Sequence, residues 1–216
     1  MVGGRLMIEE DPLAVADDLS IDAQFFKWCT KTRPKKIVYF SSSASYPVSL
    51  QSYENHAKLK ESDITFDADI GMPDLTYGWS KLTGEYLGKL AHSKYDLDVV
   101  SFRPFSGYGE DQDLSYPFPA ICKRAIDSTI NNEKSFFVWG SGLQQRDFIH
   151  IDDCVRGATL ILNQVNDGSA VNLSTGTPTS FIDLAKLILK KVGTSDLPIV
   201  TQKSKPEGVF ARYGDT

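Results

Sequence analysis

Short apolar runs of strand length alternate with longer amphipathic segments along this sequence. The apolar runs are 36–42, 97–103, 136–139, 148–151, 171–174 and 198–200. The helical patterns are 12–33, a segment that begins near Leu75, 117–131, 152–163 and 180–192. Strands separated by helices of about ten or more residues predict βαβ units and a parallel sheet covered on both faces. The alternation therefore predicts an α/β fold with a doubly wound parallel sheet, in which ligands bind outside the carboxyl ends of the strands.

The composition excludes several classes of protein. The 216 residues are 41% hydrophobic, enough to bury a core in one domain or in one domain with a small second lobe. A net charge of −5 argues against a nucleic-acid partner, and no apolar run approaches the roughly 18 residues of a membrane-spanning helix. Cys29, Cys122 and Cys154 are far apart and odd in number, which indicates reduced thiols rather than disulfides or a metal site. Because no apolar leader opens the sequence, we expect a cytoplasmic protein.

A tyrosine and a lysine four residues apart are the sharpest local feature. Tyr77 and Lys81 fall in the first turns of the helix expected near Leu75, so both side chains lie on one helical face. A phenol with its usual pKa near 10 is a poor base at neutral pH, and a nearby ammonium group helps to lower that pKa. The pair thus indicates an acid/base site. The alternative is a tyrosine that packs against the sheet beside a solvated lysine.

A run of serines follows the first apolar strand. It begins at Ser41, ends in Tyr46 and Pro47, and falls at the sheet edge where ligands bind. A hydroxyl at this edge can hydrogen-bond a substrate alcohol while the tyrosine takes its proton. The alternative is a polar strand exit made of turn-forming residues. The two signals together, in this order and on these elements, favour the catalytic interpretation.

Four blocks of sequence, in order, resemble one family. They are SSSASYP at 41–47, YGWSK at 77–81, RPFSGYG at 103–109 and WGSGLQQRDFIHIDD at 139–153. Together they resemble the extended short-chain dehydrogenase/reductases that act on nucleotide sugars, the NAD-dependent epimerase/dehydratase family, and within it the branch of GDP-mannose 3,5-epimerase and GDP-fucose synthase.

The resemblance implies a domain organisation and a set of partners. A partial NAD(P)-binding Rossmann domain would occupy 1–106 and be rejoined by about 149–178. A nucleotide-sugar-binding lobe would comprise 107–148 and 179–216. The family pattern also implies a homodimer through helices 12–33 and 77–93, with NAD or NADP as cofactor and a GDP- or UDP-sugar as substrate.

The same resemblance assigns roles to residues by motif position. Tyr77 matches the acid/base, Lys81 its partner and a ribose ligand, and Ser43 the hydroxyl donor. The remaining cofactor-binding residues are Ser41, Pro104 and Phe105, and the substrate-binding residues are Gly3, Ser43, Ser45, Ser106, Tyr116, Trp139, Arg146 and Arg212. Arg146 matches an arginine that holds a phosphate, with the capping of backbone carbonyls as its alternative. Trp139 lies where guanosine-sugar members have a tryptophan near the base, with a place in the core as its alternative.

Two departures from the family pattern limit the expected activity. No strand, glycine-rich turn and helix for a dinucleotide pyrophosphate precedes the first block, so we expect a fragment that does not hold NAD tightly by itself. Ser45 and Tyr116 stand where the 3,5-epimerase branch has a cysteine and a lysine or histidine, and serine is a far weaker base than a thiolate. The expectation is an NAD-dependent epimerase, or a partial copy of one, that oxidises a sugar hydroxyl with Tyr77, Lys81 and Ser43 and reduces it again from the opposite face. The alternative is a non-catalytic subunit that binds a sugar nucleotide without a dinucleotide.

Overall fold

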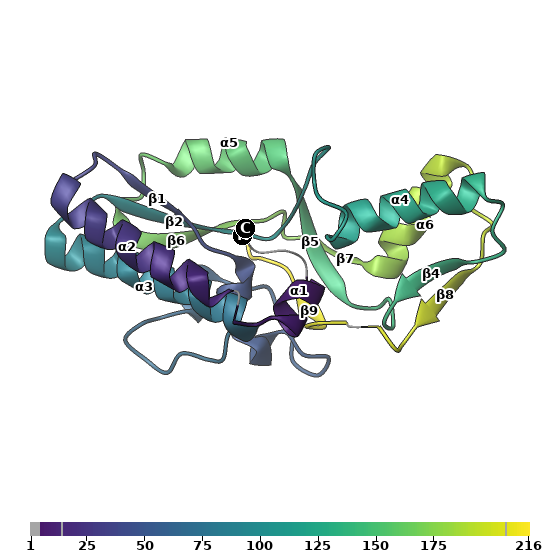
Figure 1. The fold of residues 1–216 in the computed structure, drawn as a ribbon, viewed down its shortest axis with the longest axis horizontal. Helices are drawn as coiled ribbons and strands as arrows, with labels where there is room; N and C mark the ends of the chain where they lie inside the picture. Colours follow the sequence, from purple (N-terminus) through teal and green to yellow (C-terminus); the bar gives the residue numbers. More distant parts are fainter. Residues whose placement is uncertain (1–4, 14, 206) are drawn as a thin grey trace.

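The computed structural model describes residues 5–13, 15–205 and 207–216 (Figure 1). Its helices are α1 (Arg5–Glu10), α2 (Ala16–Thr32), α3 (Leu75–Tyr95), α4 (Pro117–Ile130), α5 (Ile151–Ile161) and α6 (Phe181–Val192), with the short 3-10 helices η1 (Ser43–Ser45), η2 (Val48–Leu50) and η3 (Glu61–Asp63). Its strands are β1 (Ile37–Phe40), β2 (Val99–Pro104), β3 (Ser106–Tyr108), β4 (Phe136–Trp139), β5 (Gln145–His150), β6 (Asp167–Leu173), β7 (Pro178–Ser180), β8 (Ile199–Gln202) and β9 (Ala211–Arg212). The predicted α/β class is confirmed.

A parallel sheet in the order β1-β2-β6 forms the central layer. Ile37 pairs with Val99 at the start of β1, and Phe40 pairs with Phe102 at its end. Helices α2 and α3 cover one face of this sheet, and α5 covers the other (Figure 1). The core residues on the α2–α3 side are Phe26, Cys29, Ile37, Tyr39, Ala91, Leu97 and Val99, and those on the α5 side are Val100, Phe102, Ile149, Cys154 and Leu173. A parallel sheet with helices on both faces is the predicted doubly wound arrangement.

A second group of strands leads from this sheet to a smaller lobe. β3 and β9 pair with β5 in parallel, and β7 pairs with β5 in antiparallel orientation. Beyond them, α4 and α6 pack against the two-stranded parallel sheet β4-β8 (Figure 1). Ile121 of α4, Phe136 of β4 and Leu184 of α6 share one core. Helix α6 begins after Ser180, whose side chain caps the first turn, and ends at Gly193 with φ 86°, a left-handed conformation that favours glycine.

The predicted elements were right in type and wrong at several boundaries. The strand expected at 148–151 begins at Gln145 instead, because pairing with β7 and β9 extends it. β6 begins at Asp167 rather than at residue 171, since its first residues pair with β2. The elements α1, β3, β7 and β9 were missed; they have six, three, three and two residues, which is too short for a hydrophobic period to show.

Two findings concern what the described residues lack. No helix among them combines the length and the apolar character needed to cross a membrane. No group of three or more His, Cys, Asp or Glu side chains among them is placed to hold a metal ion. Cys29 and Cys154 are buried, Cys122 is half-buried, and all three thiols are free.

Candidate active site

The chain makes a tight turn where β1 ends, at the carboxyl edge of the central sheet. We call Ser41–Ser45 the serine turn. Its Ser42 side chain caps the 3-10 helix by accepting a hydrogen bond from the Ala44 N–H at 3.1 Å. Small polar residues suit this position because their hydroxyl groups satisfy backbone groups where the strand ladder stops. The turn therefore presents hydroxyl groups at the edge where parallel sheets bind ligands.

Helix α3 approaches the serine turn very closely. The Asp74 N–H donates a hydrogen bond to the Ala44 carbonyl at 2.9 Å. A Cβ at Gly78 would collide with the same carbonyl oxygen, so only glycine permits this approach. The close approach of α3 to the serine turn thus explains why a glycine follows Tyr77, which the motif alone did not reveal.

Tyr77 and Ser42 meet at this contact. The Ser42 side chain hydrogen-bonds Tyr77, and this bond favours the phenolate. Burial acts in the opposite direction and is the larger effect, so the pKa of Tyr77 is raised above its ordinary value. Further charges around the phenol are those of Tyr116 and Asp18, which raise its pKa, and of Arg212, which lowers it. The structure therefore brings Tyr116 and Arg212, two of the expected substrate-binding residues, into the surroundings of Tyr77.

Lys81 lies on the same face of α3, one turn after Tyr77. Its Nζ atom is 5.9 Å from the centre of the Tyr77 ring and 5.5 Å from the centre of the Tyr39 ring. The Tyr39 hydroxyl donates a hydrogen bond to an Asp22 carboxylate oxygen at 2.6 Å. The ammonium group of Lys81 thus lies near two tyrosine rings, those of Tyr39 and Tyr77. Tyr77 and Lys81 are on one helix face, as their spacing predicts.

Two other serines of the turn, Ser41 and Ser45, are bonded to each other in the interior. Ser43 is 4% exposed and Ser45 is fully buried, and the Oγ atoms of Ser41 and Ser45 are 3.0 Å apart. The sequence interpretation placed the hydroxyl donor at Ser43 and a substrate contact at Ser45. The serine whose side chain interacts with Tyr77 in the structure is Ser42. Counting positions along a run of serines does not reveal which of them the turn exposes.

The block after β2 lies at the same edge of the sheet. Pro104 ends β2 opposite Leu173, and Ser106 begins β3 opposite Phe148. Phe105 is 6% exposed and packs in a small core with Tyr46. These positions lie at the carboxyl end of β2, beside the serine turn at the end of β1.

Two arginines face each other across neighbouring strands. Arg146 of β5 pairs in register with Arg212 of β9. Arg212 donates to Gln51 and to Asp74, each at 2.6 Å, and thereby ties the end of the chain to the start of α3. Arg146 Nη1 donates to the backbone carbonyls of Gln145 and Val209 at 2.7 and 3.0 Å. The Arg212 charge is thus paired with that of Asp74, and Arg146 makes the carbonyl contacts that were the alternative to phosphate binding.

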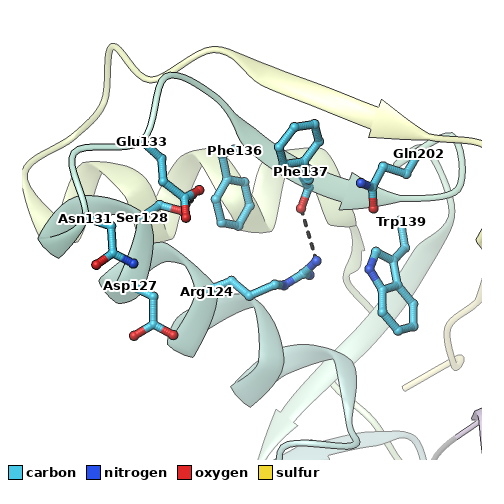
Figure 2. A pocket seen from close by; sticks show the side chains of 9 residues that line it. All are labelled: Arg124, Asp127, Ser128, Asn131, Glu133, Phe136, Phe137, Trp139 and Gln202. Atoms are coloured by element: carbon cyan, nitrogen blue, oxygen red, sulfur yellow. Dashed lines mark hydrogen bonds between the residues drawn. The ribbon is translucent and has the colours of Figure 1, made fainter.

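Trp139 lies apart from this cluster, in the smaller lobe. Its side chain is 41% exposed and lines a cavity of about 440 Å³ between α4 and β4 (Figure 2). Arg124 reaches across this cavity, donates to the Phe137 carbonyl at 3.1 Å and places its Cζ atom 5.8 Å from the centre of the Trp139 ring. Trp139 is therefore not a core residue. Gly3, the remaining expected substrate contact, lies outside the described residues.

The raised pKa of Tyr77 leads to a prediction about the chain without ligands. In protein labelled with 3-fluorotyrosine, the Tyr77 phenol is expected to titrate at higher pH than free 3-fluorotyrosine, because burial outweighs the Ser42 hydrogen bond. Fluorine NMR measures this titration, and a Tyr77→Phe variant assigns the signal. A midpoint below that of the free amino acid would contradict the described environment.

A doubly wound sheet with serine, tyrosine and lysine gathered at its carboxyl edge places the chain among the Rossmann-like α/β proteins. The NAD dependent epimerase/dehydratase family matches residues 5–174. The chain belongs to this family.

Similarity to individual proteins adds detail. The chain is 26% identical over 212 residues to a GDP-L-fucose synthase of Sinorhizobium fredii (strain NBRC 101917 / NGR234), an alignment that covers 96% of this chain and 65% of the relative. It is 31% identical over 196 residues to the GDP-mannose 3,5-epimerase of Arabidopsis thaliana, which covers 84% of this chain and 46% of the relative. A structure of UDP-glucuronic acid 4-epimerase from Bacillus cereus, in complex with UDP-glucuronic acid and NAD, is similar with a TM-score of 0.71 and 26% identity over 92% of this chain and 58% of that one. The chain thus spans between about half and two thirds of the length of these proteins.

Proposed function

We propose that the chain carries the catalytic edge and the substrate lobe of an NAD(P)-dependent nucleotide-sugar 4-epimerase. The observation that supports this proposal is the contact of Tyr77 with Ser42, with Lys81 on the same helix face. A phenol, a hydroxyl and an ammonium group at one sheet edge are what the removal of a proton from an alcohol requires.

The residues fit one end of a dinucleotide. By family resemblance Lys81 and Tyr77 would hold the ribose next to the reacting ring, and Pro104 and Phe105 would line that ring; Ser41, which we expected beside it, is engaged in the interior. Bound NAD(P) supplies the acceptor and donor of the hydride in such a reaction. The helices α2 to α6 begin after Val15, Asp74, Tyr116, His150 and Ser180, so none of them starts from a glycine turn of the kind that holds a pyrophosphate.

In the proposed reaction the chain's own groups move and hold a proton. Tyr77 takes the proton of a sugar hydroxyl as a phenolate, and returns it after the sugar has been reduced from its other face. When substrate is bound, the single Ser42 proton turns from Tyr77 to the sugar oxygen and orients it, and Lys81 stabilises the phenolate. Counted from Ser42 instead of Ser43, the position at which the 3,5-epimerase branch has its cysteine is Ala44 rather than Ser45. Alanine carries no acid/base group. The proton exchange of a 3,5-epimerase therefore has no residue to perform it there.

The substrate would lie across the arginine pair and the cavity of the smaller lobe. Arg146 and Arg212 are suited to a diphosphate, because guanidinium groups bind phosphate oxygens in a planar, bidentate manner. The exposed Trp139 ring and the Arg124 guanidinium beside it offer planes on which a guanine or uracil base stacks (Figure 2). We accordingly propose the smaller lobe as the nucleotide-binding part and a GDP- or UDP-sugar as the substrate.

We further propose a homodimer through α2 and α3. These helices pack against each other and expose several large apolar residues, between 36% and 61% exposed. The set comprises Ile21, Phe25 and Trp28 of α2 and Trp79 and Tyr86 of α3. Exposed apolar surface of this kind marks interaction sites. Analytical ultracentrifugation that found only a monomer at micromolar concentration would contradict this part of the proposal.

A second candidate is a nucleotide-sugar-binding subunit without catalysis. It is favoured by the helix starts given above, which offer no glycine-rich cradle for a dinucleotide among α2 to α6. It differs from the first candidate in one observable, which is the turnover of the chain in the presence of NAD or NADP.

Product analysis by NMR with NAD or NADP and with UDP-glucose or GDP-mannose tests the proposal. We expect the 4-epimer of one of these sugars, a loss of at least about tenfold in rate for Ser42→Ala, and a rate within about twofold of the unchanged protein for Ser43→Ala. A larger loss for Ser43→Ala than for Ser42→Ala would restore the original assignment of the hydroxyl donor. No product with any combination would contradict the catalytic proposal and favour the binding subunit.

A further inference from the structure

A buried ion pair lies directly behind the serine turn. Glu85 of α3 and Arg103 of β2 are 1% and 2% exposed. Arg103 binds the Glu85 carboxylate through two hydrogen bonds, from Nε to Oε1 at 2.9 Å and from Nη2 to Oε2 at 2.6 Å. The proton transfer proposed above does not use either residue, so the pair needs a separate explanation.

The pair is bonded to the serine turn at its beginning and just past its end. The Ser41 hydroxyl donates to Glu85 Oε1, and its oxygen is also 3.0 Å from the Oγ atom of Ser45. Arg103 Nη1 donates to the hydroxyl of Tyr46, the residue after the turn, at 3.0 Å. We call Ser41, Ser45, Tyr46, Glu85 and Arg103 the serine-turn network.

The ion pair lies beside a cavity as well as beside the turn. Glu85 and Arg103 both border a cavity of about 280 Å³, which also touches Ile64, Phe66 and the start of β6. A buried ion pair adds little stability compared with apolar residues of the same volume, because removing two charges from water is costly. What a fully satisfied polar network does provide is a single, fixed geometry.

One helix connects the network to the phenol. Tyr77, Lys81 and Glu85 follow one another at intervals of four residues on α3, so the same rigid element carries the proposed acid/base and the carboxylate that holds the turn. On the other side of the turn, α3 touches the Ala44 carbonyl through the Asp74 N–H. Ser42 lies between these two attachments.

We infer that the serine-turn network fixes Ser42 against Tyr77, which makes Ser41 and Glu85 positioning residues of the site. The inference rests on the proposed function for its effect on catalysis, but its structural part is testable without turnover. Ser41 is the best place to cut the network, since its hydroxyl joins the carboxylate to the turn and its removal leaves the Glu85–Arg103 pair intact.

The test compares Ser41→Ala with Ser101→Ala. Ser101 lies on the neighbouring strand β2 and is also fully buried. Its hydroxyl has no hydrogen-bond partner among the residues that the structure describes, so the control removes a buried hydroxyl that holds none of them. In 3-fluorotyrosine-labelled protein, Ser41→Ala is expected to raise the Tyr77 midpoint by about one pH unit, because the hydrogen bond from Ser42 is loosened. Ser101→Ala is expected to leave the midpoint unchanged within about 0.2 units.

A second variant keeps the test possible if the Ser41→Ala protein does not fold. Ser45→Ala cuts the other end of the same link and is expected to shift the midpoint in the same direction by a smaller amount. A folded Ser41→Ala or Ser45→Ala protein with an unchanged Tyr77 midpoint would overturn the inference. Because the readout needs neither cofactor nor substrate, an inactive wild-type chain would contradict the proposed function and leave this test unaffected.

Discussion

A Tyr77→Phe variant is expected to lose about 10²- to 10⁴-fold in kcat for the epimerisation, the usual contribution of a positioned acid/base group. Phenylalanine keeps the ring that packs beside the serine turn and removes only the hydroxyl that Ser42 contacts. The Kd for the nucleotide sugar is expected to stay within about twofold, because the Tyr77 hydroxyl is not one of the proposed phosphate and base contacts. Steady-state kinetics and calorimetry measure the two quantities on the same protein.

Tyr95→Phe is the matched control for this prediction. Tyr95 is the last residue of the same helix, and its side chain is 52% exposed. The loss of its hydroxyl therefore leaves the site unchanged. Its kcat is expected to be unchanged within about twofold. A Tyr77→Phe protein that kept wild-type turnover would contradict the assignment of Tyr77, and an equal loss of substrate affinity would assign it to binding instead.

An Arg103→Leu variant is expected to lose about 3–5 kcal/mol of unfolding free energy, because it leaves the buried Glu85 carboxylate without its partner. Burial alone would lower the pKa of Arg103, but Glu85 and Tyr46 raise it above its ordinary value, so the guanidinium is charged and fully engaged. Urea unfolding followed by circular dichroism measures the loss. The m-value is expected to remain that of the wild-type protein.

Two comparisons make the cause of that loss identifiable. The double variant Glu85→Leu with Arg103→Leu is expected to be more stable than Arg103→Leu alone, since it removes both charges together. Lys123→Ala breaks the exposed Lys123–Asp127 pair on α4 and is expected to cost at most about 0.5 kcal/mol. The single variant Glu85→Leu completes the comparison. If the double variant lost as much unfolding free energy as Glu85→Leu and Arg103→Leu lose together, Arg103 would stabilise the fold by packing rather than by its charge pair.

The sequence predicted those features that depend on long hydrophobic patterns. The alternation of apolar runs and helical segments was enough for the doubly wound sheet, because a parallel sheet buried on both faces leaves continuous apolar strands. The spacing of Tyr77 and Lys81 was enough for a shared helix face. The hydrophobic alternation and the four-residue spacing both reflect the local geometry of strands and helices, so they can be recognised in the sequence.

The details of the site depend on contacts between distant segments, and the sequence did not contain them in readable form. The interaction of Ser42 with Tyr77 depends on the close approach of α3 to the 3-10 turn, which Gly78 allows. Nothing local distinguishes the three consecutive serines. The Glu85–Arg103 pair joins residues 18 positions apart on a helix and a strand, so only the fold brings them together.

We expect this chain to bind a nucleotide sugar beside the Ser42–Tyr77–Lys81 site. Calorimetric titration of the purified chain with GDP-mannose and with UDP-glucose, each with and without NAD, tests it most directly. The expected result is saturable binding of one sugar nucleotide at one site per chain, and a loss of at least about tenfold in affinity for Arg146→Ala. Absence of saturable binding for both sugar nucleotides, with and without NAD, would contradict it.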